Sequence, residues 1–277
     1  MFDLSMLQTG TLRRVRAKHG DFLVLAGDSN GIGALLAYYG EFCDHEIDLL
    51  NALIQPGETV VEVGANIGTH TIPLARRLSP TGNLIAIEAQ PVIAMLLQAN
   101  LALNDIGWVD VRLMAAADAQ GKICIPVVDY RTVGNAGAVS LIGADSDGWL
   151  QSSTIDSLNV CPSLIKIDVE GMELVVLKGA RQTLRRSQPK IYIENNPFPK
   201  EQSLSTLRWL RSEGYELYWD VKSLHNPNNF KGQSQPFFSD GFSSNVLALP
   251  RDHDVDLRNL RVEVVIEGAE HPLAHLH

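Results

Sequence analysis

Short apolar runs alternate with amphipathic stretches along most of the 277-residue chain. Apolar runs bounded by turn residues predict strands, and apolar positions that recur every three or four residues predict helices. The predicted strands cover residues 59–63, 83–88, 109–115, 164–168, 190–194, 215–219 and 244–249. The predicted helices cover 32–39, 44–54, 69–78, 91–103, 172–186 (with a kink at Gly179) and 202–213. A β-hairpin over 12–18 and 22–26 precedes them.

This alternation is typical of an α/β fold, in which helices cover both faces of a mostly parallel sheet. We divide the chain into an N-terminal hairpin-and-helix extension (1–55), a main domain (56–250) and a polar C-terminal tail (251–277). Two irregular insertions, 128–147 and 222–240, interrupt the main domain. Ligands of such sheets bind beyond the carboxyl ends of the strands, so the residues that follow each strand are the first candidates for a site.

The composition narrows the class of protein. Hydrophobic residues make up 45% and charged residues 20% of the chain, which fits a globular protein and excludes a disordered one. No apolar stretch approaches the roughly 20 residues that cross a bilayer, so we expect no membrane span. The net charge of −9 argues against nucleic acid as a partner. Three scattered cysteines argue against disulfides and zinc, and we expect a cytoplasmic protein.

The strongest motif lies between the strand at 59–63 and the helix that follows it. Gly64 and Gly68 allow a sharp turn there, and Asn66 is a residue type that tolerates a left-handed backbone. The helix start that follows offers free N–H groups. Glu88 ends the next strand, where a carboxylate can accept hydrogen bonds from ribose hydroxyls. Together the loop and Glu88 predict a cofactor that contains a nucleoside.

The spacing of the loop indicates which cofactor binds. A dinucleotide fingerprint, G-x-G-x-x-G, fails twice, because Asn66 and Thr69 stand where glycines are required. The pattern acid-x-Gly-x-(Gly/Asn)-x-Gly fits instead, with Glu62, Gly64, Asn66 and Gly68. It resembles motif I of class I S-adenosylmethionine-dependent methyltransferases, in which the loop packs against the amino-acid part of the cofactor.

A second motif is LIKIDVEGME, at 164–173. Lys166 and Asp168 are two positions apart in a predicted strand, so their side chains point to the same face. Charges at the end of a buried strand are costly unless they form pairs or bind a ligand. Asp168 stands at the carboxyl end of that strand, where we expect the reaction to occur.

Longer segments resemble one particular family. LIKIDVEGMELVVLKGA (164–180) and the segment from 60 to 91 resemble the hallmark and cofactor-binding parts of the FkbM-type methyltransferases. Shorter matching pieces lie at 38–46, 134–141, 153–158, 191–196 and 217–232, so that the resemblance covers about 38–250. It implies a Rossmann-like, seven-stranded sheet. It also implies methyl transfer from S-adenosylmethionine, usually to a hydroxyl oxygen of a sugar, polyketide or other secondary metabolite.

The resemblance also implies roles for single residues around the cofactor. Glu88 would hold the ribose, and Asp118 would accept the adenine amino group. For Glu41 it is the position just before the main domain, rather than the resemblance, that suggests a role, either closing over the cofactor or packing against the core. The full set of predicted cofactor-binding residues is Glu62, Gly64, Ala65, Asn66, Gly68, Glu88, Asp118 and Glu41.

The chemistry of the transfer suggests the remaining roles. The protein must hold an oxygen in line with the activated methyl group, exclude water and remove a proton. Asp168 is our first choice as base or substrate clamp, and Glu194 ends the neighbouring strand. His70 and His225 are alternative bases because histidine titrates near neutrality. Asp168, Glu194 and Asn195 would also form a Mg²⁺ site. The predicted substrate-binding residues are Asn135, Asn195, Asn196 and Trp219.

Three functions remain open at this point. The first is O-methylation of a small molecule or glycan, with N-methylation as a variant of it. The second is an NAD(P)-linked oxidoreductase on a similar sheet, and the third is a cofactor-binding module without turnover. The acceptor and the oligomeric state are not specified by any pattern in the sequence. The four histidines of the tail have no zinc-binding spacing, and we expect the tail to be mobile.

Overall fold

The structure is a computed structural model that describes residues 10–140, 148–239, 241–268 and 270–276. Part of the predicted insertion 128–147, and His277 of the tail, lie outside the described residues. No helix among the described residues is long and apolar enough to cross a membrane.

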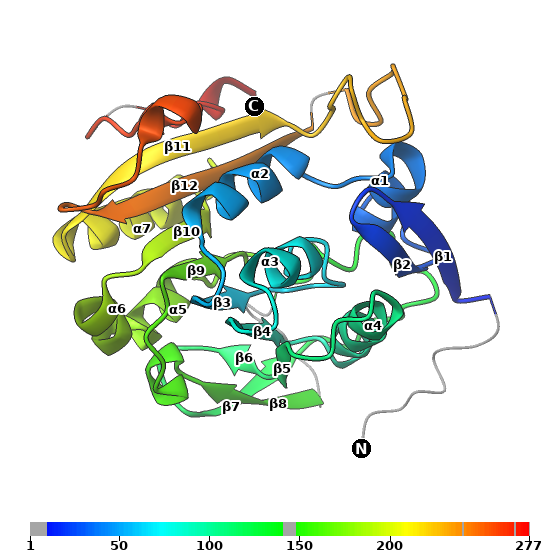
Figure 1. Ribbon diagram of the computed structural model, residues 1–277, viewed down its shortest axis with the longest axis horizontal. Coiled ribbons are helices and arrows are strands. Elements are labelled where there is room, and N and C mark those ends of the chain that lie inside the picture. Colours follow the sequence, from blue (N-terminus) through cyan, green and yellow to red (C-terminus); the bar gives the residue numbers. More distant parts are fainter. Residues whose placement is uncertain (1–9, 141–147, 240, 269, 277) are drawn as a thin grey trace.

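A large twisted sheet forms the centre of the molecule (Figure 1). Its described strands lie in the order β13-β11-β12-β10-β9-β3-β4-β5. From β5 to β10 the neighbouring strands are parallel, whereas β12 is antiparallel to both β10 and β11. The strands are β3 (Thr59–Val63), β4 (Asn83–Glu88), β5 (Asp110–Leu113), β9 (Leu164–Ile167), β10 (Lys190–Glu194), β11 (Tyr215–Ser223), β12 (Phe242–Pro250) and β13 (Glu263–Val264). The mostly parallel sheet is confirmed, with β13 as one strand beyond the expected seven.

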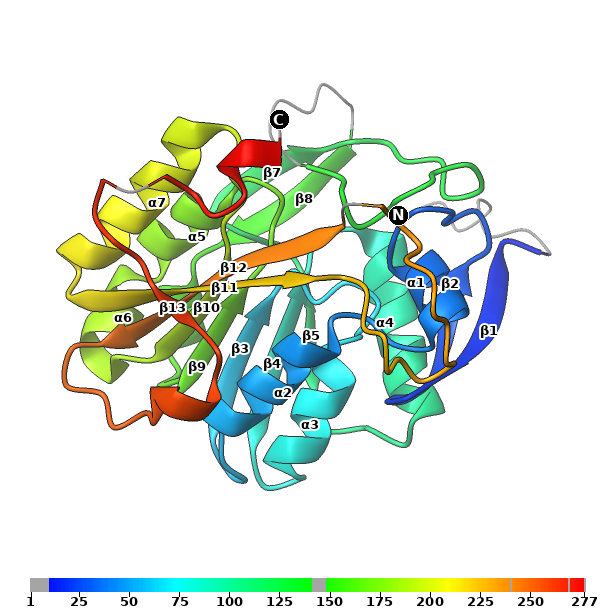
Figure 2. The same ribbon diagram turned by 90° about the horizontal axis from the view of Figure 1, so that it is seen from above.

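Helices cover both faces of this sheet (Figures 1 and 2). Successive residues of a strand point to opposite faces, so Val60 packs into one hydrophobic core and Val61 into the other. The first core contains residues of α2, α3 and α4, and the second contains residues of α5, α6 and α7. The helices are α1 (Ile32–Tyr39), α2 (Asp44–Leu53), α3 (Thr71–Leu78), α4 (Pro91–Leu103), α5 (Glu173–Gly179), α6 (Arg181–Ser187) and α7 (Lys200–Ser212).

The N-terminal extension packs against the main domain. Its hairpin, β1 (Leu12–Ala17) and β2 (Gly20–Leu25), lies on α4, where Asn100 Oδ1 accepts a hydrogen bond from the Leu23 N–H at 2.6 Å. Helices α1 and α2 follow the hairpin, and the chain then enters β3. The extension therefore covers one side of the carboxyl ends of the strands.

Two predicted elements differ in detail. The helix expected over 172–186 is divided into α5 and α6 at Gly179, where a Cβ would lie 1.9 Å from the Ala117 carbonyl oxygen. The strand expected over 109–115 ends at Leu113, because the chain then leaves the main sheet. It enters a separate three-stranded sheet, β6-β8-β7, that the sequence pattern did not predict. These strands are β6 (Ala115–Ala116), β7 (Gly121–Ile125) and β8 (Gly148–Ser153).

The expectation of a mobile tail is wrong for the part of the tail that the structure describes. β13 pairs with β11, and the side chain of Val265 is buried in the second core. His271 packs against the Trp219 ring with the ring centroids 4.5 Å apart. Apolar and hydrogen-bonded contacts therefore hold the tail against the edge of the sheet.

Candidate functional site

A cavity of about 270 Å³ opens at the carboxyl ends of β3, β4, β9 and β10. The chain leaves β3 toward β4 on one side and returns to β9 on the other, so the cavity lies where the strand order reverses. Nine of the predicted site residues line it: Gly64, Ala65, Asn66, His70, Glu88, Asn135, Asp168, Glu194 and Asn196. The topology thus brings most of the predicted site together from five separate parts of the chain.

The loop after β3 forms the base of the cavity. Gly64 and Gly68 have φ values of +82° and +95°, and Asn66 has φ +49°. A Cβ on Gly64 would lie 1.7 Å from the Asp168 carbonyl oxygen. Gly64 is therefore required for the close packing of the loop against the end of β9, as well as for its left-handed backbone.

Glu88 connects this loop to the end of β4. Its carboxylate accepts hydrogen bonds from the Asn66 N–H at 2.9 Å and the Gln90 N–H at 2.8 Å. Burial raises the pKa of Glu88 to about 7, although these backbone hydrogen bonds oppose the rise. Each carboxylate oxygen has a second lone pair, so Glu88 can still accept hydrogen bonds from a ligand in the cavity.

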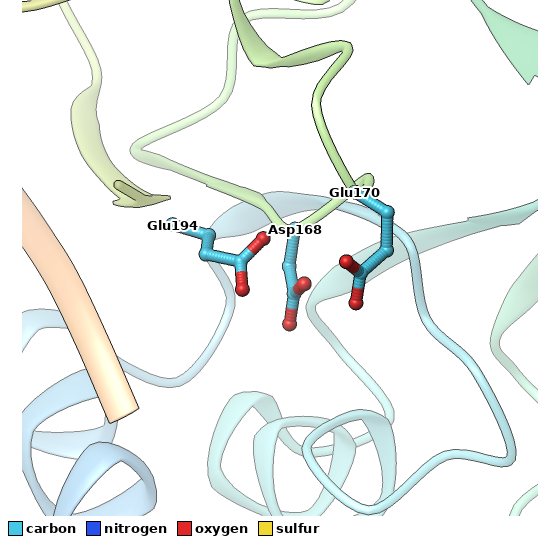
Figure 3. Close-up of side chains that lie close together, drawn as sticks. All are labelled: Asp168, Glu170 and Glu194. Atoms are coloured by element: carbon cyan, nitrogen blue, oxygen red, sulfur yellow. The ribbon is translucent and has the colours of Figure 1, made fainter. Parts of the chain in front are cut away.

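Three carboxylates gather on the side of the cavity formed by β9 and β10 (Figure 3). Asp168, Glu170 and Glu194 each place an oxygen within 4.8 Å of the other two. Burial and the neighbouring charge of Asp168 raise the pKa of Glu170 to about 7 and that of Glu194 well above its ordinary value. Glu170, which the sequence analysis did not select, stands in the DVEG segment and has φ +52°. A backbone strained in this way is common at functional sites.

A buried lysine lies beneath this carboxylate cluster. Lys166 is 2% exposed, and its Nζ lies 3.2 Å from Asp168 Oδ2. Burial alone would lower the pKa of Lys166, but the charges of Asp168, Glu62 and Glu46 more than offset this effect and the pKa is raised. Glu62 does not line the cavity, and burial raises its pKa. Its Oε2 has no hydrogen-bond partner among the described residues.

Glu46 is a buried site residue that sequence reasoning missed. It lines the cavity from α2, and its Oε2 lies 3.2 Å from His70 Nε2. Its Oε1 accepts a hydrogen bond from Asn245 Nδ2 at 3.0 Å. Burial would raise the pKa of Glu46, but His70 and Lys166 lower it to about 2. A signal was present, because Glu46 ends the segment 38–46 that resembles the family.

The wall opposite the strands comes from the N-terminal extension and the first insertion. Gly134 O accepts hydrogen bonds from the N–H groups of Ser29 and Asn30, both at 3.0 Å. Asn135 lines the cavity, and its Oδ1 accepts hydrogen bonds from the Gly137 and Ala138 N–H groups. The side-chain oxygen of Asn135 therefore stabilises the turn that follows it. Its side-chain amide nitrogen can still donate a hydrogen bond to a ligand.

The structure places other predicted residues away from the cavity. Asp118 is exposed and Gly68 packs beside Leu97, and neither lines the cavity. The carboxylate of Glu41 accepts hydrogen bonds from Asn226 Nδ2 at 2.6 Å and the Phe230 N–H at 2.9 Å. Glu41, just after α1, thus forms hydrogen bonds to the second insertion and does not face the cavity.

Three residues predicted near the acceptor also lie outside the cavity lining. The Asn195 side chain is buried and bonded to Ser203, so it does not join the carboxylate cluster. His225 stacks on Tyr39 with ring centroids 5.8 Å apart. Trp219 is buried under His271 of the tail. Asn195 is held away from the site by a residue of the next helix, and His225 and Trp219 by residues distant in the sequence.

Comparison with known proteins gives one family. A family model described as the methyltransferase FkbM domain matches residues 62–217, more than half of the chain. Over 57 residues the chain is 40% identical to a probable ribosomal RNA small subunit methyltransferase A from Methanosphaera stadtmanae. That match covers 20% of each protein, so the chain spans only a fifth of this relative's length.

Solved structures with a similar fold include methyltransferases of low sequence identity. A methyltransferase FkbM from Methylobacillus flagellatus is 19% identical, with a TM-score of 0.48 over 70% of this chain and 44% of that one. An S-adenosylmethionine-dependent O-methyltransferase from Thermotoga maritima is 13% identical, with a TM-score of 0.48 over 88% and 79%.

The matched segment includes the cavity's central residues. Residues 62–217 contain the glycine loop, Glu88, and all three members of the carboxylate cluster. Outside this segment the described structure includes the N-terminal extension, most of the second insertion, β12 and the tail. The chain belongs to the FkbM family of S-adenosylmethionine-dependent methyltransferases.

Proposed function

We propose that this protein transfers the methyl group of S-adenosylmethionine to a hydroxyl oxygen of a sugar, glycan or secondary metabolite in the cytoplasm. The observation that carries the proposal is one cavity that joins the glycine loop and Glu88 to the carboxylates of Asp168 and Glu194. The glycine loop and Glu88 suit a cofactor that contains a nucleoside. The carboxylates of Asp168 and Glu194 suit an acceptor that must lose a proton. The family assignment favours methyl transfer over a nicotinamide-linked oxidation.

The residues on the β3–β4 side fit the cofactor. Gly64, Ala65 and Asn66 line the cavity, and the remaining lone pairs of Glu88 can accept hydrogen bonds from ribose hydroxyls. When bound, S-adenosylmethionine supplies a methyl group that its sulfonium already activates. The protein therefore needs no strong electrophile of its own, and its residues are left with orientation, exclusion of water and removal of a proton.

Asp168 is the proposed base. Lys166 Nζ, 3.2 Å from Asp168 Oδ2, holds this carboxylate at the end of β9. Three carboxylates this close in a half-buried site disfavour full ionisation of all three, and burial together with the charge of Asp168 raises the pKa of Glu194 well above its ordinary value. In this proposal Asp168 takes the hydroxyl proton, and Glu194, beside it in the cluster, carries the proton that lets it donate a hydrogen bond to the acceptor. His70 faces Glu46 and is the alternative base.

A divalent cation is a separate part of the proposal. Carboxylate oxygens are ligands that Mg²⁺ prefers, and Glu170 stands where Asn195 was expected beside Asp168 and Glu194 (Figure 3). Such an ion would lower the pKa of the acceptor hydroxyl and orient it. Turnover that is unchanged by excess chelator would exclude the ion and leave the role of Asp168 intact.

Calorimetric titration with S-adenosylmethionine, with NAD as the comparison ligand, tests the cofactor site. Wild-type protein should bind S-adenosylmethionine, and Glu88→Ala should weaken binding by about tenfold, or about 1.4 kcal/mol. Asp118→Ala, at an exposed acid outside the cavity, is the matched control and should bind like wild type. Tight binding of NAD instead would favour the oxidoreductase.

Transfer of labelled methyl to methyl glycosides tests turnover and the choice of base. Asp168→Asn should lower the rate by about 10²-fold or more if this carboxylate is the base. A larger loss in His70→Asn than in Asp168→Asn would identify the histidine instead. Binding of S-adenosylmethionine with no transfer to any hydroxyl or amine acceptor would favour the non-catalytic module.

A further inference from the structure

The C-terminal tail reaches the acceptor side of the cavity. After β13 has paired with β11, the Arg211 guanidinium donates a hydrogen bond to the Val265 carbonyl at 2.7 Å. The chain then brings His271 to the ends of β10 and β12. This segment lies outside the residues matched by the family model, and its contact with the site is a feature of this chain's own structure.

His271 makes polar contacts with both of these strand ends. Its Nε2 lies 2.9 Å from the Asn195 carbonyl oxygen and 3.1 Å from Ser244 Oγ. Ser244 Oγ also donates a hydrogen bond to the Asn195 carbonyl at 3.0 Å, and the Asn195 N–H donates one to Ser244 O at 3.0 Å. The imidazole thus closes a small network over the Asn195 carbonyl.

The second ring nitrogen determines the role of the first. Nδ1 of His271 accepts a hydrogen bond from the Leu273 N–H at 3.0 Å, so it carries no proton. Nε2 then carries the hydrogen of the neutral ring and donates it to the Asn195 carbonyl. Burial lowers the pKa of His271, which favours the same neutral form.

The carbonyl that His271 holds lies between two residues of the site. Glu194 belongs to the carboxylate cluster and Asn196 lines the cavity, while Ser244 lines it from β12. Movement of the Asn195 peptide would shift both neighbours relative to Asp168. A displacement of about 1 Å of groups that hold a substrate can cost about 10²-fold in rate.

We propose that His271 is a positioning residue of the acceptor site, and that it acts through the Asn195 carbonyl to hold Glu194 and Asn196 in place. The inference rests on the proposed function, because it assigns the acceptor to the β9–β10 side of the cavity. It extends the site beyond the family domain into the tail. The cofactor side, formed by the glycine loop and Glu88, has no contact with His271 among the interactions described for the two segments.

The chain offers a matched control in the same tail. The His253 ring also lies against an aromatic residue of β11, Tyr218, at 6.3 Å, and its Nδ1 also accepts an N–H bond, from Val255 at 3.2 Å. Its Nε2 lies 3.7 Å from Glu216 Oε2, and it does not line the cavity. His271→Phe and His253→Phe therefore remove similar local contacts, but only His271→Phe removes a hydrogen bond to the Asn195 carbonyl.

The test compares methylation of methyl glycosides by wild type, His271→Phe, His271→Gln and His253→Phe. We expect His271→Phe to raise the KM for the glycoside or lower kcat/KM by about tenfold, with the Kd for S-adenosylmethionine within about twofold of wild type. His271→Gln retains an N–H donor and should recover most of the loss. Equal losses in both Phe variants, or parallel loss of cofactor binding, would overturn the proposal.

Hydrogen–deuterium exchange separates this inference from the proposed function. If wild type methylates no glycoside, the proposed substrate class fails, but exchange can still be measured on the apoprotein. His271→Phe should then speed amide exchange at 194–196 by about tenfold, whereas His253→Phe should not. Exchange at 64–70 should be unchanged in both variants. Unaltered exchange at 194–196 in His271→Phe would show that the Asn195 carbonyl is held without His271.

Discussion

Replacement of Lys166 by methionine tests whether one buried cation stabilises the charges below the cavity. Lys166 is 2% exposed and lies among Asp168, Glu62 and Glu46. Methionine has a similar length and leaves little cavity, so the main loss is the charge. Glu62 and Glu46 then remain buried without their shared partner, whereas the Asp168 side chain is 40% exposed.

The expected loss of stability is large. Removal of one partner from a fully buried ion pair costs about 3–5 kcal/mol, and solvent screening of the half-exposed Asp168 places the expected loss toward the lower end of this range. Glu62 adds to the cost, since its Oε2 has no hydrogen-bond partner among the described residues and the charge of Lys166 is what offsets its burial. A loss of this size is a large fraction of the roughly 5–15 kcal/mol that stabilises a typical domain.

The loss should depend on pH. Without the cation the pKa of Glu62, which burial already raises, rises further in the folded state, and a carboxyl whose folded pKa is raised destabilises the protein increasingly as pH rises above its unfolded value of 4.5. The deficit of Lys166→Met should therefore be larger at about pH 8 than at about pH 5. The Lys166 charge of the wild type is present at both pH values, because its folded pKa is raised above 10.5.

Urea unfolding at the two pH values measures these differences. Lys178→Met, at an exposed lysine on α5, is the control and should change stability by less than about 0.5 kcal/mol. Addition of Glu62→Gln to Lys166→Met should recover part of the loss, because it removes one uncompensated charge. A deficit below about 1 kcal/mol, or one that is equal at both pH values, would refute this account of the buried network.

Further predictions concern the glycine loop after β3, the buried pair Glu46–His70, and the charge of the acceptor. Gly64→Ala should abolish S-adenosylmethionine binding and lower the melting temperature, because the added Cβ would lie 1.7 Å from the Asp168 carbonyl oxygen. Gly107→Ala is the control and should do neither, because no atom lies within 4 Å of a Cβ at that position. Glu46→Gln should destabilise the protein at neutral pH, and urea titrations should show the difference from wild type shrinking as pH falls from 4.5 toward 2, where the low pKa of Glu46 no longer contributes. The kcat/KM for a phosphate ester of an accepted glycoside should be about tenfold or more lower than that for the neutral glycoside, because the acceptor side of the cavity carries three carboxylates. Equal kcat/KM values would contradict the placement of the acceptor beside these carboxylates.

The strand–loop–helix unit around Gly64 could be predicted because its determinants are local. An apolar strand, two glycines with positive φ and a helix start follow one another within a few residues, and Glu88 ends the next parallel strand at the same edge. The fold class followed from the same alternation of strands and helices. The small sheet β6-β8-β7 was missed because β6 is only two residues long and pairs with a strand far along the chain.

The acceptor side was harder to predict because its geometry depends on side-chain contacts and backbone turns that the strand-and-helix pattern does not specify. Asn195 follows β10 as expected, yet its side-chain oxygen accepts a hydrogen bond from Ser203 on α7 and does not reach the carboxylate cluster. Glu170 joins the cluster because its backbone adopts a strained, left-handed conformation. Glu46 was missed because its partners, His70 and Asn245, lie far along the chain. Strand-end position alone does not specify which side chains point into a cavity.

By itself, the sequence determined the α/β class, the glycine loop, the strand-end acids and a resemblance to one family. These features depend on backbone preferences and on spacing over a few residues, which are nearly independent of the rest of the chain. Only the tertiary structure decided that Lys166 and Glu46 form one buried network and that the tail covers Trp219. It also brought His271 to the Asn195 carbonyl, because packing between distant segments selects which polar groups are buried together.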